Sequence, residues 1–221
     1  MKWYWVKTNR IIKNIFSGFI WDFPTSRKIV YLTFDDGPTP EITDWTLDIL
    51  KKYDAKATFF CIGENIKKHP DLFKSIQNQG HSIGNHTENH INGWNSAAEG
   101  YIQNVKRCEK TIQEFSIENY KFQHIFRPPY GKVTPQQFKL LKKSNYKVIM
   151  WDVLSADFDA SISPEKCAEH VIKNIEPGSV VIFHDSLKAS KNLKLALSQT
   201  LTFLQKNEYE MKAIQFDLEP N

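Results

Sequence analysis

The chain has 221 residues, of which 41% are hydrophobic and 24% are charged, and it carries a formal net charge of +4. This length and composition exclude a disordered chain and are sufficient for one large domain with a substantial core. The positive charge comes from scattered lysines without a dense basic run, so the chain shows no nucleic-acid-binding signature. The three cysteines, Cys61, Cys108 and Cys167, have no Cys-x-x-Cys spacing and are expected to be buried or incidental thiols.

Residues 1–27 form a segment that we separate from a domain at 28–221. Basic residues are interleaved with large apolar side chains up to residue 20, which predicts an amphipathic helix. No apolar run approaches the roughly 20 residues that span a bilayer, and no apolar core precedes a small-residue cleavage site. We therefore expect neither a transmembrane helix nor a clear signal peptide. Two interpretations stay open: residues 1–20 make peripheral contact with a membrane, or the helix packs across one end of the domain.

The remaining sequence alternates between apolar runs of strand length and segments of helical periodicity. In chain order these are strand 28–34, helix 43–53, strand 57–62, helix 69–80, strand 81–85, helix 97–115, strand 120–126, helix 135–144, strand 146–151, helix 164–174, strand 179–184, helix 192–207 and strand 211–216. About seven strand–helix units without an internal linker or repeat predict a single α/β domain with a parallel sheet.

Two adjacent carboxylates, Asp35 and Asp36, stand directly after the first predicted strand and before Gly37-Pro38. Neighbouring side chains on an extended backbone point in opposite directions, so one aspartate can bind a metal while the other faces a substrate. Two anions side by side at a buried strand end are costly unless a cation compensates them. The pair therefore favours a bound cation with further ligands elsewhere in the chain.

His86 and His90 are candidates for those further ligands. On a helix or helical turn, a spacing of four residues places both rings on one face, as in the zinc motif H-E-x-x-H. Together with Asp36 they form a set of two nitrogens and one oxygen that leaves a position for water, which is typical of catalytic zinc sites. Taken alone, the histidine pair is also typical of a solvated polar loop.

Three more polar segments follow or end predicted strands. They are Arg127-Pro-Pro-Tyr-Gly131, the run 151–158 with sequence WDVLSADF, and Ile182-Phe-His-Asp185. The two prolines exclude a helix interior at the first segment, which can hold a cation and a backbone amide in place. Polar residues at the carboxyl ends of strands are where a (β/α) barrel gathers its active site.

The five segments TFDDGP, HTENH, RPPYG, WDVLSADF and IFHD occur in the order found in the polysaccharide deacetylase (NodB-homology) family, carbohydrate esterase family four. The chain closely resembles this family over most of its length. The resemblance implies a TIM-like, irregular (β/α)7 barrel in a single domain, with 28–221 as the catalytic domain. Phe158 stands where the family commonly has tryptophan and Leu154 where it often has an acid, which changes the expected shape of the substrate groove.

The resemblance also implies an activity: metal-dependent removal of N-acetyl groups from N-acetylhexosamine units of peptidoglycan, a chitin-like chain or an exopolysaccharide. Asp35 resembles the family's general base, which Arg127 would hold ionised and aimed. His184 resembles the general acid that protonates the departing amine, and Asp157 would orient it. These roles suit amide hydrolysis, because water must lose a proton and nitrogen must gain one.

Three further residues are assigned to oxyanion or substrate contacts in the same comparison. The backbone N–H of Tyr130 would help to hold the tetrahedral oxyanion, and Phe158 and Ile182 are expected to contact substrate. Trp94 is a further candidate wall of the groove. Both Phe158 and Trp94 are equally explained as core aromatic side chains.

Alternative roles stay open for the catalytic residues. Asp35 can serve as a second metal ligand, His184 as a core histidine at a strand end, and Arg127 as a structural ion-pair partner. At the level of function, the alternatives are a deacylase or deformylase acting on a lipid-linked sugar and an inactive carbohydrate-binding relative.

Imidazole and carboxylate ligands favour Zn²⁺ and also accommodate Co²⁺, Ni²⁺ or Mn²⁺. We expect a monomer whose partner is an N-acetylated glycan, with no nucleic acid. The family favours the cell envelope or a membrane-associated location, and a cytoplasmic location is also compatible with the sequence.

Overall fold

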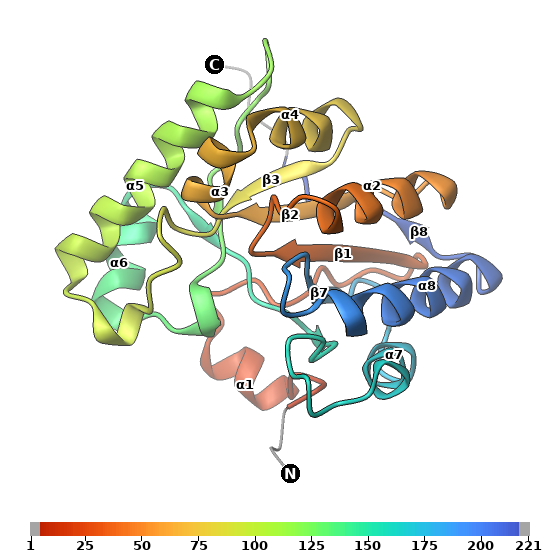
Figure 1. Cartoon of the computed structure of the whole chain (residues 1–221). Coiled ribbons are helices and arrows are strands. Elements are labelled where there is room, and N and C mark those ends of the chain that lie inside the picture. The colour runs from red at the N-terminus through yellow and green to blue at the C-terminus, as the bar shows by residue number, and fades with distance from the viewer. Residues whose placement is uncertain (1–4, 217–221) are drawn as a thin grey trace.

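The computed structural model describes residues 5–216 of the chain, with a curled parallel sheet at the centre and helices around it (Figure 1). The strand order is β5-β4-β3-β2-β1-β7-β6, and β8 pairs with β1 outside this path. Every pairing between these strands is parallel. The predicted single-domain α/β fold with seven parallel strands in a curled barrel is confirmed.

Four strands are long and buried, and they match the predicted apolar runs. They are β1 (Ile29–Asp35), β2 (Ala57–Cys61), β3 (Ser82–Asn85) and β7 (Val180–His184). Asp35 is the register partner of Phe60 in β2 and of His184 in β7. This register places the carboxyl ends of β1 and β7 side by side.

The other strands are two residues long, and here the sequence prediction is less accurate. They are β4 (Ile125–Phe126), β5 (Lys147–Val148), β6 (Val153–Leu154) and β8 (Glu210–Met211). The strands expected at 120–126, 146–151 and 211–216 are therefore much shorter, and β6 was not expected. A run of apolar residues does not show how many of its backbone groups are hydrogen-bonded to a neighbouring strand. It therefore overestimates the lengths of these strands.

The helices flank the sheet and mostly fall within two residues of their predicted bounds. They are α1 (Arg10–Ile15), α2 (Ile42–Lys52), α3 (Gly63–Lys68), α4 (Pro70–Asn78), α5 (Ala98–Phe115), α6 (Pro135–Lys143), α7 (Pro164–Ile172) and α8 (Ser190–Lys206). The predicted cap at Ser163 is confirmed, because its side chain accepts a hydrogen bond from the backbone of Lys166. The short helix α3 was not expected.

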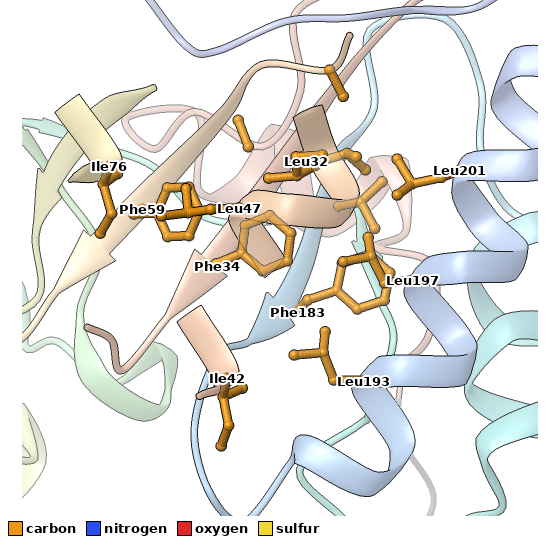
Figure 2. Close-up of a cluster of buried hydrophobic side chains, with 14 of the residues drawn as sticks. Leu32, Phe34, Ile42, Leu47, Phe59, Ile76, Phe183, Leu193, Leu197 and Leu201 are labelled. Carbon is orange, nitrogen blue, oxygen red and sulfur yellow. The ribbon is translucent and has the colours of Figure 1, made fainter. Parts of the chain in front are cut away.

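Stacked aromatic rings and leucines form the core between the long strands and α8. Figure 2 shows Phe34 between Phe59 and Phe183, with ring centroids 5.0 Å and 5.9 Å from that of Phe34, and the leucines of α8 directed toward them. All three rings are fully buried. The three cysteines are free and buried, as predicted. This packing fixes the strand ends that carry the polar residues.

The N-terminal segment lies along the two strands at the ends of the sheet order, β5 and β6. The amide of Met150, just after β5, donates to the carbonyl of Ile20 at 2.7 Å, and Leu154 of β6 donates to the carbonyl of Val6 at 2.8 Å. Within residues 5–20 of the expected amphipathic helix, only Arg10–Ile15 is helical, because residues on either side of it pair with strands. Residues 1–4 of that expected helix lie outside the described part of the chain.

Buried Asp152 fixes this segment to the barrel. One of its carboxylate oxygens accepts from Lys7 at 2.7 Å and from Ser179 at 2.5 Å, and the other accepts from Lys13 at 2.5 Å. Lys13 also pairs with Asp22. The contacts of Asp152 therefore join the N-terminal segment to the barrel, which is a structural role. Across residues 5–216, none of the helices is long and apolar enough to cross a bilayer.

Candidate active site

Asp35 ends β1 and is held by a cation from the loop after β4. Arg127 is fully buried, and one of its terminal nitrogens donates to Asp35 Oδ1 at 2.7 Å and to Thr33 Oγ1 at 2.7 Å. Its other nitrogens donate to the carbonyls of Ile149 and Met150 at 3.1 Å and 2.8 Å. The guanidinium also lies over the ring of Phe60, 4.2 Å from its centroid. Four hydrogen bonds and this ring contact leave Arg127 a single orientation, so Oδ1 of Asp35 is fixed with it.

Asp36 leaves the strand in a left-handed conformation with φ of 81°. The next peptide, Gly37-Pro38, is cis. The amide of Gly37 donates to Asp185 Oδ1 at 3.1 Å, and Thr43 at the start of α2 donates to Oδ2 at 2.5 Å. A Cβ on Gly37 would lie 2.1 Å from this carboxylate, so only glycine fits the turn.

The turn changes the predicted relation between the two aspartates. They were expected to face opposite directions, but Asp35 Oδ2 and Asp36 Oδ1 lie 3.9 Å and 3.7 Å from the same atom, His86 Nε2. The alternation of side chains holds only within an extended strand, and Asp36 lies beyond the end of β1. Both carboxylates therefore border one candidate cation site.

The histidine pair lies on a loop after β3, and the helical turn expected for residues 86–90 is absent. Thr87 and His90 have φ values of 66° and 52°, which no helix contains. Asn104 of α5 holds the loop, because its side-chain oxygen accepts from the amides of Glu88 and Asn89 at 2.8 Å and 3.2 Å. The rings still converge, with centroids 5.1 Å apart.

Asp36, His86 and His90 form a group that can hold a metal ion, as predicted. One ligand atom of each lies within 4.8 Å of the others. Asp36 Oδ1 is buried without a hydrogen-bond partner, although His90 Nε2 is 3.2 Å away. A buried carboxylate oxygen without a donor is costly, and a cation would compensate it. The residues therefore fit a divalent ion.

The protonation states of His86 and Asp36 also suit the binding of a cation. Burial lowers the pKa of His86 to about 4, so its imidazole is neutral at pH 7. The His86 Nδ1–H donates to the carbonyl of Arg127 at 2.8 Å, which leaves the Nε2 lone pair directed toward Asp36. Burial opposes ionisation of Asp36, but His90, His184 and His86 hold its pKa well below the usual range. Neutral imidazole and ionised carboxylate are the forms that bind metals.

The end of β7 presents a second pair, His184 with Asp157. His184 Nδ1 lies 2.8 Å from Asp157 Oδ1, and the backbone amide of His184 donates to Oδ2 at 2.8 Å. Burial disfavours the charged imidazole, but Asp157, with Asp36 and Asp35 nearby, raises the pKa of His184 to about 9. His184 therefore carries a proton at neutral pH. The ring of Phe158 packs edge-on against it, with centroids 5.0 Å apart.

The residues expected to contact oxyanion or substrate differ in accessibility. Tyr130 is 61% exposed with φ of 60°, and its ring centroid lies 4.7 Å from that of His90. Trp94 is 65% exposed, with Lys132 Nζ 4.9 Å from its ring centroid. Ile182 is buried beside Leu154 and Ala156 and presents almost no surface. Tyr130 and Trp94 are thus accessible to a ligand, whereas the buried side chain of Ile182 does not offer the surface that the expected substrate contact needs.

Sequence reasoning missed several residues that hold the site in place. The hydroxyl of Thr33 accepts a hydrogen bond from Arg127 and donates one to the carbonyl of Val181 at 2.8 Å. Burial and Asp36 raise the pKa of Asp185 to about 8, although hydrogen bonds from Thr43 and Gly37 oppose the rise. Thr33 shares a strand face with Asp35, and Asp185 directly follows His184. Their positions beside these motif residues were the one sequence signal that could have identified them. Asn104 lies on a distant helix, and nothing in the sequence connects it with the histidine loop.

Comparison with known proteins agrees with this geometry. A model described as polysaccharide deacetylase matches residues 22–149. The chain is 34% identical over 200 residues to a peptidoglycan-N-acetylglucosamine deacetylase of Bacillus cereus, covering 90% of this chain and 92% of that protein.

Solved structures give the same result. A crystal structure of a peptidoglycan N-acetylglucosamine deacetylase has a TM-score of 0.83 at 31% identity, covering 89% of this chain and 91% of the other. A family CE4 pseudoenzyme from Bacillus anthracis has a TM-score of 0.78 at 27% identity, covering 88% and 66% of the two chains. The predicted family is confirmed: the chain belongs to the polysaccharide deacetylase family.

Proposed function

We propose that the protein is a metal-dependent de-N-acetylase of N-acetylhexosamine units in peptidoglycan. One observation carries the proposal. A carboxylate fixed by a buried arginine and a protonated histidine fixed by a buried aspartate stand at register-paired positions of β1 and β7. The candidate metal group lies beside that carboxylate. The relatives' names favour peptidoglycan over a chitin-like chain or exopolysaccharide.

Asp36, His86 and His90 would hold the metal ion. When bound, a divalent ion lowers the pKa of water and polarises an amide carbonyl. Two imidazoles and one carboxylate favour Zn²⁺, and Co²⁺, Ni²⁺ or Mn²⁺ remain compatible with the same donors.

Asp35 would act as general base. Its Oδ1 is occupied by Arg127 and its Oδ2 faces the metal group, so Oδ2 is the atom that takes the proton from the attacking water. Because Arg127 is fully buried, its charge acts on Oδ1 of Asp35 with little solvent screening. The short contact with Arg127 also keeps Oδ1 from becoming a second metal ligand.

His184 would act as general acid. Its Nδ1–H donates to Asp157, which leaves the proton on Nε2 for the sugar nitrogen when the carbon–nitrogen bond breaks. Water thus supplies the hydroxyl of the released acetate, and the amine departs with the proton from His184. The backbone N–H of Tyr130 would stabilise the oxyanion, which for one such donor is worth roughly 3 kcal/mol. Phe158 and Ile182 would shape the substrate side of the acid.

Acetate release from peptidoglycan fragments and N-acetylglucosamine oligomers, with and without chelator, tests the proposal. Asp35→Asn should reduce turnover by about 10³-fold while retaining bound metal, whereas His86→Ala should lose both. Asp48→Asn, an exposed aspartate of α2, is the matched control. Full activity of Asp35→Asn would reject the base assignment.

The same assay separates the alternatives. A pseudoenzyme among the structural neighbours keeps an inactive carbohydrate-binding relative as the competing proposal, favoured if the metal-loaded protein binds glycans without releasing acetate. Release of formate or another acyl group from a lipid-linked sugar would support the second alternative. Assignment of catalysis to residues 28–221, a monomeric state and a location at the cell envelope remain predictions.

A further inference from the structure

Positive charge is concentrated in two segments of the chain. Residues 1–21 contain four Lys or Arg and no Asp or Glu, and residues 119–151 contain seven and none. The remaining residues carry 18 basic and 25 acidic side chains, so they are net negative. Lys7, Lys13 and Arg127 are ion-paired within the fold, with Asp152, Asp22 and Asp35 among their partners. The positive charge that a binding partner could meet is therefore carried by exposed residues such as Arg10, Lys139, Lys142 and Lys143.

These two basic segments pack together. The ring of Phe19, just after α1, meets that of Phe138 of α6 edge-on, with centroids 4.5 Å apart. A Cβ on Gly18 would lie 2.7 Å from the Phe138 ring, so the backbone approaches α6 as closely as glycine allows. Between them lies a cavity of about 240 Å³, lined by Ile15, Phe16, Phe19, Val133 and Phe138 among others.

Large apolar side chains of the N-terminal segment are exposed, and two of them, Ile15 and Phe16, line this cavity. Trp5, Ile11, Ile15 and Phe16 are 69%, 64%, 66% and 49% exposed. No residue of α1 is buried, so the apolar side chains of this helix contribute little to the core. A group of large apolar side chains on the surface is typical of an interaction site.

The two helices that meet at this cavity, α1 and α6, also carry exposed cations. Arg10 of α1 and Lys139, Lys142 and Lys143 of α6 are exposed. Lys142 lies one helical turn after Phe138, with its Nζ 5.9 Å from that ring centroid. We call the exposed side chains Arg10, Ile11, Ile15, Phe16, Lys139, Lys142 and Lys143 the α1–α6 face.

We infer that the α1–α6 face binds the surface of an anionic phospholipid membrane. The exposed cations of this face complement anionic headgroups, and its exposed isoleucines and phenylalanine match the interfacial region below them. A soluble polyanion would be attracted by the lysines but offers nothing to these apolar side chains. The inference sharpens the expectation of membrane contact through residues 1–20, because it adds α6 and specifies lipid charge.

The loop between β4 and α6 connects this face with the candidate active site. The cavity is bordered by Val133 and Thr134, and Thr134 caps α6. Tyr130, which contacts His90, lies on the same loop. Membrane contact at this face would therefore bring the site close to the lipid surface.

Vesicle co-sedimentation of the full chain tests the inference. Binding should be strong to vesicles containing phosphatidylglycerol, weak to phosphatidylcholine alone, and reduced by salt. Ile11→Gln with Ile15→Gln should weaken binding about tenfold or more, because two interfacial side chains are lost. Lys139→Gln with Lys142→Gln should weaken it about fivefold per charge.

Matched controls separate the face from general properties of the protein. Lys74→Gln with Lys110→Gln removes the same charge from exposed sites on α4 and α5, and Leu187→Gln removes an apolar side chain that is 78% exposed elsewhere. Both controls should bind like the original chain, and circular dichroism should show all variants folded. Equal binding to neutral vesicles, or equal losses in the controls, would overturn the inference.

A soluble anionic polymer gives the remaining decisive outcome. If polyglutamate binds as tightly as anionic vesicles, and Ile11→Gln with Ile15→Gln does not change vesicle binding, then charge alone explains the face and the membrane inference fails. The measurement requires no turnover, so it succeeds or fails independently of the proposed deacetylase activity.

Discussion

The two halves of the barrel are stabilised by different interactions. The half with β1, β2, β3 and β7 consists of strands of four to seven residues over a core of stacked aromatic rings and leucines. In the half with β4, β5 and β6, each strand has two residues. There, buried polar contacts of Arg127 and Asp152 connect segments that few ladder hydrogen bonds hold.

The difference explains the placement of the candidate site. Asp35 and His184 end long strands, so apolar packing positions them. Arg127 and Asp157 come from the short-strand half, and each reaches a long strand through a charged contact. Asp35 and His184 are thus each oriented by a side chain from the opposite half. Removing such a contact should affect stability as well as catalysis.

Arg127→Met should produce the largest loss of stability in this comparison, about 4 kcal/mol in the free energy of unfolding. The substitution leaves the Asp35 carboxylate buried without its cation, and it frees two backbone carbonyls after β5. Urea unfolding at pH 7 measures the change.

A double variant shows whether charge is the cause. Arg127→Met with Asp35→Asn removes both ionic groups, so it should be more stable than Arg127→Met alone. A loss below about 1 kcal/mol for Arg127→Met would mean that the short-strand half does not depend on this contact.

Leu197→Ala should cost about 3 kcal/mol in the free energy of unfolding. Leu197 is fully buried on α8, where it packs against the long-strand half (Figure 2). Urea unfolding compares it with Lys191→Ala, an exposed position one and a half turns earlier, which should change little. Similar values for both variants would contradict the view that apolar packing stabilises this half.

The same contrast decides what the sequence could predict. Strands 28–34, 57–62 and 179–184 were recognisable because both faces are buried and the apolar runs are nearly continuous. Strand β6 was not recognisable, because two residues give no periodicity, and its pairing with Val181 and Ile182 of β7 and its bridge to Lys7 leave no local signal. The pairing of Val6 and Ile20 with opposite ends of the sheet also has no local signal, which is why a longer helix was expected there.

The sequence predicted which residues belong to the candidate site better than it predicted the geometry of the site. Asp36, His86 and His90 converge as expected, although the histidine spacing was assigned to a helical turn. A spacing of four also fits a loop with left-handed residues at Thr87 and His90, and residue types alone do not distinguish the two. Asn104 and Thr33 could not be found from motif spacing, because their contribution is visible only in their hydrogen bonds.

The charge on His184 gives a pH test within the long-strand half. Its pKa in the folded protein is about 9, above the ordinary value of 6.5, so the folded state binds the proton more tightly. The resulting stability is fully present below pH 6.5 and is lost as pH rises toward 9. In chelator-treated protein the contribution should be on the order of 2–3 kcal/mol.

Comparison with His184→Gln measures this contribution. The variant should be less stable than the original chain at pH 6, and the difference in the free energy of unfolding should shrink as pH rises from 7 to 10. Urea unfolding at each pH measures this difference. A difference that stays constant over this range would show that Asp157 does not hold a proton on His184.

Asp152→Asn should have the smallest effect, about 1–2 kcal/mol in the free energy of unfolding. The substitution removes the charge that pairs with Lys7 and Lys13, but both lysines retain some contact with solvent, and the neighbouring backbone hydrogen bonds of Thr8 and Leu154 remain. The loss should therefore be local. Limited proteolysis should cleave near residues 5–20 sooner than in the original chain, while Ser179→Ala, which removes one neutral donor to Asp152, should show a smaller change. Unchanged proteolysis would mean that backbone pairing alone holds the N-terminal segment against β5 and β6.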